Sequence, residues 1–319
     1  MFSRHIHWAI PFAAFALLPR VGLGQQSAGV PQELNVRQAV ETSRSPLSQP
    51  GLHVVITAGG SYVVPADLDE GGRLAVGRES LVLGLERVGA GGSMVGATFD
   101  HEWSQYNFSG SDAPADADGL RDFSMTRFGV NARRTLSSTN WSLFAAADVT
   151  YGVEDGASWN DGRTMGGLIS VRRQVNEKFG VSLGLMAHQR LEQRAMVFPI
   201  PSFDWKITDR LSLRTAQGLT LSWQVDDRKR WQADISANFE QRDYRLNSDA
   251  AQPGGILHDR RVPLLAGLRF GPRPGTFIRV YAGVAFAQEV EFLDADGNKV
   301  SDSKLDPSPM AGIQGSVRF

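Results

Sequence analysis

The sequence predicts an all-β protein whose chain forms a transmembrane, antiparallel, up-and-down β-barrel of about 14 strands, with 12 strands as the alternative. Three observations predict this fold. A short apolar leader opens the chain, an alternation of apolar and polar residues begins after Gly51 and continues almost without interruption, and the last alternating strand ends on Phe319. Alternation with period two is typical of strands that present one face to an apolar medium and the other to water.

The leader has the parts of a secretory signal peptide. Arg4 precedes an apolar run at residues 8–18, and Gly22-Leu23-Gly24 supplies small residues for cleavage. A run of this length is too short to cross roughly 30 Å of hydrocarbon as a helix, so a transmembrane anchor is disfavoured. We therefore assign residues 1–24 to a signal peptide. The polar, proline-broken segment 25–50 is predicted to be a flexible periplasmic lead-in.

The predicted barrel occupies residues 51–319, and its clearest strands are 231–240 and 141–151. One face of the strand 141–151 carries Trp141, Leu143, Ala145, Ala147, Val149 and Tyr151. Aromatic residues at both ends, with small aliphatic residues between them, are typical of a membrane strand. Comparable alternation marks residues 52–64, 80–88, 93–104, 123–136, 164–175, 179–191, 197–207, 210–215, 219–226, 231–240, 260–271 and 276–292.

The connectors between these runs alternate in length. Tight connections are predicted at 89–92, 137–138, 176–178, 208–209, 227–230 and 272–275, and long polar loops at 65–79, 105–122, 152–163, 246–259 and 294–307. Short periplasmic turns and long outer loops are the arrangement of an outer-membrane barrel. Because both termini then lie in the periplasm, the strand number is even.

The sector 195–226 decides between the two strand counts. Fourteen strands require an outward turn at Ala216-Gln217-Gly218, because a single strand over 210–226 gives an odd number. Pro199 and Pro201 cannot donate hydrogen bonds to a strand ladder. They either lie above the hydrogen-bonded part of their strand or belong to an irregular sector, and in that second case the count is twelve.

The final strand predicts where the protein resides. Ala311, Ile313, Gly315, Val317 and Phe319 share one face. An alternating strand with a terminal Phe resembles the closing strand of outer-membrane barrels, where that residue is part of the signal read by the assembly machinery. We therefore expect the bacterial outer membrane as the location. The expected partners are outer-membrane lipid, lipopolysaccharide and the assembly machinery. A soluble β-sandwich would alternate in the same way, but it would not need the leader, the aromatic bands or the loop rhythm.

Two segments carry a family resemblance. The first is Phe198-Pro199-Ile200-Pro201-Ser202-Phe203-Asp204-Trp205, followed by Thr208-Asp209 and Leu211-Ser212-Leu213, and the second is Val280-Tyr281-Ala282-Gly283-Val284-Ala285-Phe286. The chain after residue 50 is similar in most of its length to an uncharacterised exported barrel family, a domain of unknown function in planctomycete-like bacteria. The resemblance implies a barrel in the cell envelope. It implies no activity, and no functional residue carries over.

Composition argues against several classes of function. A net charge of −1 gives no electrostatic basis for binding nucleic acid. The chain has no cysteine, so neither disulfides nor thiolate chemistry can contribute. No cofactor and no metal site is predicted. Weak divalent-ion binding stays open for the acidic loops 105–122 and 294–307. The second of these lacks the Gly and the bidentate Glu that an EF-hand requires.

Charged residues of both signs lie on the predicted inward face. The candidates for lining the lumen are Glu102, Arg127, Arg133, Asp148, Arg172, His188, Arg190, Arg279 and Glu289. Such charges ordinarily pair with one another or face water. Acidic groups placed opposite basic ones also favour the passage of polar molecules. We therefore expect a passive channel or transporter for small polar solutes.

Two other functions are weighed against this one. The first is a structural or surface-interaction barrel with a plugged lumen, which would use its acidic loops. The second is an outer-membrane hydrolase. Alternation places His101 on the opposite face from Asp100 and Glu102, and no Ser is identified within reach of His188. We therefore assign no catalytic residue and do not expect an enzyme.

Overall fold

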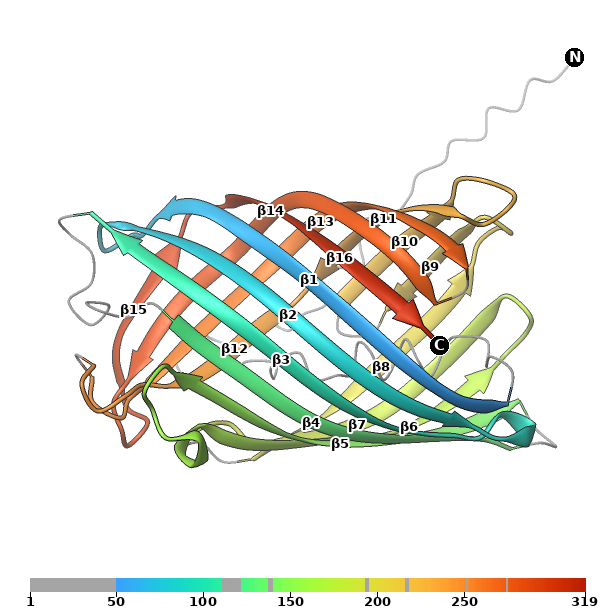
Figure 1. Cartoon of the computed structure of the whole chain (residues 1–319), viewed down its shortest axis with the longest axis horizontal. Helices are drawn as coiled ribbons and strands as arrows, with labels where there is room; N and C mark the ends of the chain where they lie inside the picture. The colour runs from blue at the N-terminus through green and yellow to red at the C-terminus, as the bar shows by residue number, and fades with distance from the viewer. Residues whose placement is uncertain are drawn as a thin grey trace, which may run out of the picture.

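The computed structural model describes residues 50–110, 122–136, 140–192, 195–215, 218–250, 252–273 and 275–319 (Figure 1). The predicted signal peptide and, apart from Pro50, the predicted lead-in lie outside these ranges. Two turns of 3₁₀ helix, Ala90–Gly92 and Trp159–Gly162, are described. Within the described ranges, no helix is long and apolar enough to cross a lipid bilayer.

The described chain is built almost entirely from β-strands. They are β1 (Gly51–Asp67), β2 (Arg73–Val88), β3 (Met94–Ser109), β4 (Asp122–Thr135), β5 (Trp141–Glu154), β6 (Arg163–Gln174), β7 (Phe179–His188), β8 (Met196–Lys206), β9 (Leu211–Thr215), β10 (Gly218–Gln224), β11 (Trp231–Asn238), β12 (Glu240–Arg245), β13 (Ile256–Arg273), β14 (Thr276–Leu293), β15 (Lys299–Leu305) and β16 (Ser308–Arg318). Neighbouring strands pair antiparallel, and together they form one sheet.

The sheet closes on itself because β16 pairs with β1, from Val55↔Arg318 to Val63↔Met310. β11 and β12 pair one after the other along β13, and β15 and β16 do the same along β14. Each of these two pairs therefore counts as one wall strand. The barrel has fourteen wall strands, which confirms the predicted fold class and removes the alternative of twelve.

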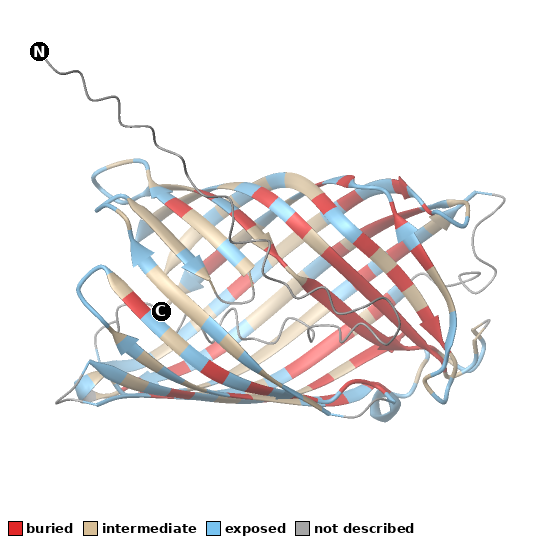
Figure 2. Ribbon diagram, turned by 180° about the vertical axis from the view of Figure 1, so that it is seen from behind, coloured by how far each residue is buried: buried red, intermediate tan, exposed pale blue. Residues whose placement is uncertain are grey.

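The alternation separates two environments, as predicted. Ile169, Leu183 and Leu185 point outward and are 68%, 60% and 59% exposed, whereas their neighbours Leu168 and Met186 are buried inside. Figure 2 shows the same succession of exposed and buried bands along most strands. The outer surface also carries the exposed aromatic side chains of Trp103, Trp141, Trp205, Trp223 and Trp231. An apolar surface of this extent is unfavourable in water and favourable in lipid.

Several outer strands extend further than the sequence predicts. β1 continues to Asp67 and β2 begins at Arg73, so the predicted loop 65–79 shrinks to a few residues. The predicted loop 294–307 contains a whole strand, β15. Leu74, Ala75 and Val76 at the start of β2 are all buried, whereas β15 is mainly polar, so neither segment shows an apolar alternation although their backbones still pair.

The sector that held the two prolines is irregular on one side. β9 and β10 form a short antiparallel hairpin, and residues 216–217 between them lie outside the described residues. β8 pairs with β7 along its whole length but with β9 only at Asp204–Lys206. Pro199 and Pro201 therefore lie inside the β7–β8 ladder but beyond the β8–β9 ladder. Neither predicted alternative is met in full, because the sector is irregular on its β9 side while the count is fourteen.

Candidate functional site

β12 continues the line of β11 along β13, and it lies in the interior of the barrel. Its sequence, Glu-Gln-Arg-Asp-Tyr-Arg, offers no apolar face, so it is unsuited to contact lipid. All six residues are buried (Figure 2). One edge of β12 pairs with β13, and its end reaches β5 through a parallel bridge between Arg245 and Val153. The outer half of the lumen is therefore closed by a strand that crosses it.

An apolar cluster fills the lumen beside β12. Tyr106 and Tyr244 are completely buried, and the ring of Phe123 packs on both at centroid distances of 5.0 and 4.8 Å. Further members include Leu74, Val76, Leu257, Val290, Phe292 and Met310. These side chains come from β1–β4 and from β12–β16, so this side of the outer half of the barrel has a packed core.

Charged groups fix β12 within this core. Arg242 donates two hydrogen bonds to Glu102 of β3, Nε to Oε1 at 2.6 Å and Nη2 to Oε2 at 2.9 Å. Glu240 accepts hydrogen bonds from Arg242 at 3.2 Å and from Arg261 at 2.8 Å. Asp243 pairs with Arg190 at 3.2 Å. Ion pairs screened from water are costly to form and costlier to break, so β12 is held in one position.

A second polar group adjoins the first, because Arg78 lies 3.7 Å from Glu102. Asp259 of β13 accepts a hydrogen bond from the Tyr106 hydroxyl at 2.5 Å and pairs with Arg78 of β2. Arg78 also donates to the Tyr106 hydroxyl at 3.0 Å. These bonds join β2 and β3 to β13 across the lumen, so the core is tied to the wall from both sides.

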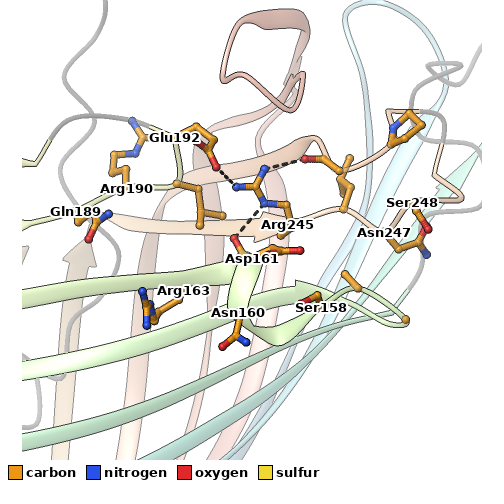
Figure 3. A pocket seen from close by; sticks show the side chains of 16 residues that line it. Ser158, Asn160, Asp161, Arg163, Gln189, Arg190, Glu192, Arg245, Asn247 and Ser248 are labelled. Atoms are coloured by element: carbon orange, nitrogen blue, oxygen red, sulfur yellow. Dashed lines mark hydrogen bonds and ion pairs between the residues drawn. The ribbon is translucent and has the colours of Figure 1, made fainter.

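Arg245, the last residue of β12, connects three outer loops (Figure 3). Its Nε donates to the carbonyl of Asp161 at 3.1 Å, and its Nη1 donates to the carbonyl of Gly254 at 2.7 Å. Its Nη2 forms an ion pair with Glu192. One guanidinium therefore joins the β5–β6, β7–β8 and β12–β13 connections, because its planar fork presents donors in several directions.

A cavity of about 1010 Å³ lies between these three loops (Figure 3). Its polar lining consists of Ser158, Asn160, Asp161, Arg163, Gln189, Arg190, Glu192, Arg245, Asn247 and Ser248. Acidic, basic and neutral polar groups are mixed there. The cavity is therefore suited to polar molecules and shows no preference for one sign of charge.

The nine lumen candidates are spread along the wall and do not form one site. Most lie in inward ion pairs, which are Glu102–Arg242, Arg127–Asp100, Arg127–Asp148, Arg172–Asp204, Arg190–Asp243, Arg279–Asp234 and Glu289–Arg260. His188 and Arg133 are buried as well. Among the nine, the structure pairs Arg127 with Asp148, and it brings Glu102 and Arg190 to neighbouring residues of β12.

Sequence reasoning missed the residues that close the lumen, Arg242, Asp243, Tyr244 and Arg245. The signal that was available is the run of charged residues directly after the clear strand 231–240. The wall strand stops at Asn238. The predicted strand 231–240 is therefore divided, and Glu240 begins β12, whose residues are all buried.

The remaining candidates do not gather into a catalytic or metal site. His101 shares a hydrogen bond of 2.7 Å with Thr126, whereas Glu102 pairs with Arg242. Asp294 accepts hydrogen bonds from the side chain and backbone of Asn298, and these hold the pKa of Asp294 below its usual range. The described residues contain no group of three or more potential metal ligands. The acidic residues Asp112, Asp116 and Asp118 lie outside the described residues.

Comparison with known proteins finds one family. The model of a domain of unknown function, DUF6268, matches residues 96–313. No curated protein matches. Among solved structures, the toluene transporter TodX of P. putida is similar over 88% of this chain and 92% of its own, with 8% identity and a TM-score of 0.49. An outer membrane channel from Pseudomonas putida F1 is similar over 86% of this chain and 97% of its own, with 11% identity and a TM-score of 0.47.

Proposed function

We propose that this chain, which belongs to the DUF6268 family of domains of unknown function, is an outer-membrane transport barrel that passes small polar solutes. The observation that carries the proposal is the polar cavity beside β12. It lies at the outer end of a closed barrel, between the loops that Arg245 joins. The planctomycete-like source implied by the sequence resemblance stays a prediction.

The outer membrane is the environment that best suits this surface. A lipid-embedded strand must satisfy its backbone hydrogen bonds within the protein, and a closed barrel does so for nearly every strand. On the outer surface, Ile169, Leu183, Val197 and Ile278 are each more than half exposed. Contact of these apolar side chains with lipid is favourable, whereas their contact with water is unfavourable. Outer-membrane lipid and lipopolysaccharide are the partners that this surface would contact.

The inward ion pairs favour solutes that are polar but carry little net charge. Arg172 and Asp204 pair on the wall at 2.6 Å, and Arg279 pairs with Asp234. Each pair neutralises itself while still presenting a dipole to the lumen. A lumen lined in this way offers hydrogen bonds to a solute without attracting ions of one sign.

The route that we propose passes beside β12. The apolar core around Tyr106 and Tyr244 obstructs a straight path along the barrel axis. The cavity lies on the other side of β12, against the loops that follow β5 and β7. A solute would enter there and continue into the inner half of the lumen.

Single-channel recording on the full-length exported protein in planar lipid bilayers tests this function. We expect small, steady conductance steps in potassium chloride, and swelling of proteoliposomes in a small neutral sugar such as arabinose. Protein that gives a compact unboiled band on a gel, yet no conductance and no swelling, would overturn the proposal. That result would favour the second candidate, a surface-interaction barrel with a plugged lumen, which the packed outer core already favours.

A further inference from the structure

The wall of the barrel is incomplete on the outer side of β8. β9 has five residues and β10 has seven, whereas β8 has eleven. The β8–β9 ladder covers only Asp204–Lys206. Among the described strands, none forms a ladder with the β9-facing edge of β8 beyond that point. The upper part of β8 is therefore an edge strand inside an otherwise closed barrel.

Above the ends of β9 and β10, the next strand of the sheet does not take their place beside β8. β11 pairs with β10 as far as Asn238 and continues as β12 after Phe239. β12 then runs inside the lumen and reaches β5. Because the chain turns inward at this level, the wall between β8 and β13 is complete only in its inner part.

The two prolines of β8 lie on this free edge. The N–H of Lys206 donates to the carbonyl of Lys178 next to β7, and the N–H of Phe203 donates to the Thr215 hydroxyl of β9. Backbone N–H groups alternate between the two edges of a strand. Odd-numbered residues of β8 therefore direct this group toward β9, and Pro199 and Pro201 are among them.

Proline at these positions adapts the edge to an apolar environment. An unpaired N–H in hydrocarbon costs several kcal/mol, on the order of a lost hydrogen bond in a solvent that cannot replace it. Proline has no N–H, so Pro199 and Pro201 remove two such groups from the free edge. They also remove two donors that an added strand from another protein would need, which makes strand addition unfavourable.

The inner surface next to this edge is apolar. Ala146, Leu168, Met186 and Phe198 are direct neighbours in the register of β5, β6, β7 and β8. They form one inward row, which ends at the free edge. Phe144 and Ile200 pack against it. We call these six residues the apolar row.

We propose that the free edge of β8 borders a lateral opening, through which apolar or amphipathic small molecules pass between the lipid and the apolar row. The occupant is a small molecule carrying a hydrocarbon or aromatic group. A protein strand is disfavoured by the missing donors, and a polar solute is disfavoured by the side chains of the row. This route is separate from the polar route beside β12, so either can fail without the other.

Fluorescence quenching by lipid tests this opening. The chain has no cysteine, so single-cysteine variants of the full-length protein can each carry one bimane label. Phe198→Cys and Ile200→Cys place the label on the inner face beside the free edge. Ala146→Cys is the matched control, because it lies in the same row but within the closed wall between β4 and β6. Val197→Cys, whose side chain is 68% exposed, reports full contact with lipid.

The labelled proteins are reconstituted in lipids that carry bromine on their acyl chains, and folding is checked by gel migration before heating. We expect severalfold stronger quenching at Phe198 and Ile200 than at Ala146, approaching that at Val197. Equal, weak quenching at all three inner positions would overturn the proposal. The polar channel is measured separately by its conductance, which the lipid bromine does not affect.

Discussion

Arg242 and Glu102 face each other across the lumen through two nearly parallel hydrogen bonds of 2.6 and 2.9 Å. The first residue belongs to β12 and the second to β3, so this pair holds the crossing strand against the far wall. The bidentate geometry gives it directional specificity as well as energy. It is therefore the contact through which the position of β12 can best be tested.

Replacing Glu102 with Gln should loosen β12. The variant leaves the buried Arg242 guanidinium with a weaker partner, which we expect to cost about 1–3 kcal/mol. We expect a severalfold increase in single-channel conductance. Asp67→Asn is the matched control, because Asp67 pairs with Arg73 at the same distance of 2.6 Å on the exposed rim. Equal conductance of the two variants would contradict this role for Glu102.

Arg245→Ala should free the outer loops from one another. The variant removes the hydrogen bonds to the Asp161 and Gly254 carbonyls and the ion pair with Glu192. We expect faster backbone hydrogen exchange in all three loops, measured by mass spectrometry. Arg163→Ala is the control, because Arg163 lines the same cavity. Faster exchange confined to one loop would show that Arg245 does not join them.

Gly312→Ala should weaken the closing strand. Gly312 lies opposite Tyr281 in the β14–β16 register, and an added Cβ would lie 2.4 Å from the tyrosine ring and 2.6 Å from the Gly60 carbonyl oxygen. Overpacking of this kind costs about 1–3 kcal/mol. We expect a lower urea midpoint for unfolding. Gly315→Ala on the same strand meets only one atom, at 3.9 Å, and should unfold like the unaltered protein.

Phe319→Ala should impair assembly in cells and leave the folded barrel nearly unchanged. The Phe319 side chain is 70% exposed, while its backbone exchanges hydrogen bonds with Val54 that alanine retains. We expect less protein in the outer-membrane fraction and an unaltered urea midpoint for purified protein. A matching loss of stability would show that the residue acts through the fold and not through recognition by the assembly machinery.

The regular wall could be predicted from the sequence because lipid and lumen impose one period on every strand. Strand 141–151 shows this clearly, since each outward residue is apolar and its inward neighbours, apart from Phe144, are small or polar. The inward path of β12 could not be predicted in this way. Its charged residues have partners on strands far away in the chain, such as Glu102 and Arg190, and no local pattern records those partners. β15 resembles a loop in sequence because its residues are mainly polar and show no apolar alternation.

The prolines of β8 are an intermediate case. The sequence indicated that Pro199 and Pro201 do not fit a closed ladder, and it offered a position above the paired region as one explanation. The edge of β8 toward which these prolines are directed follows only from the structure. The N–H of Phe203 points to β9 and that of Lys206 points to the β7 side, so the odd-numbered residues face β9. Because β9 and β10 are short, the β9-facing edge of β8 at Pro199 and Pro201 lies beyond the β8–β9 ladder.

The pairing of β12 with β13 has a consequence for electrical behaviour. All six residues of β12 are in register with β13, from Glu240↔Arg261 to Arg245↔Ile256. The obstruction is therefore continuous with the wall and cannot be ejected as a separate domain under voltage. We expect a current that stays nearly constant over time and scales in proportion to the applied potential, without the long silent intervals of a pore blocked by a detachable plug.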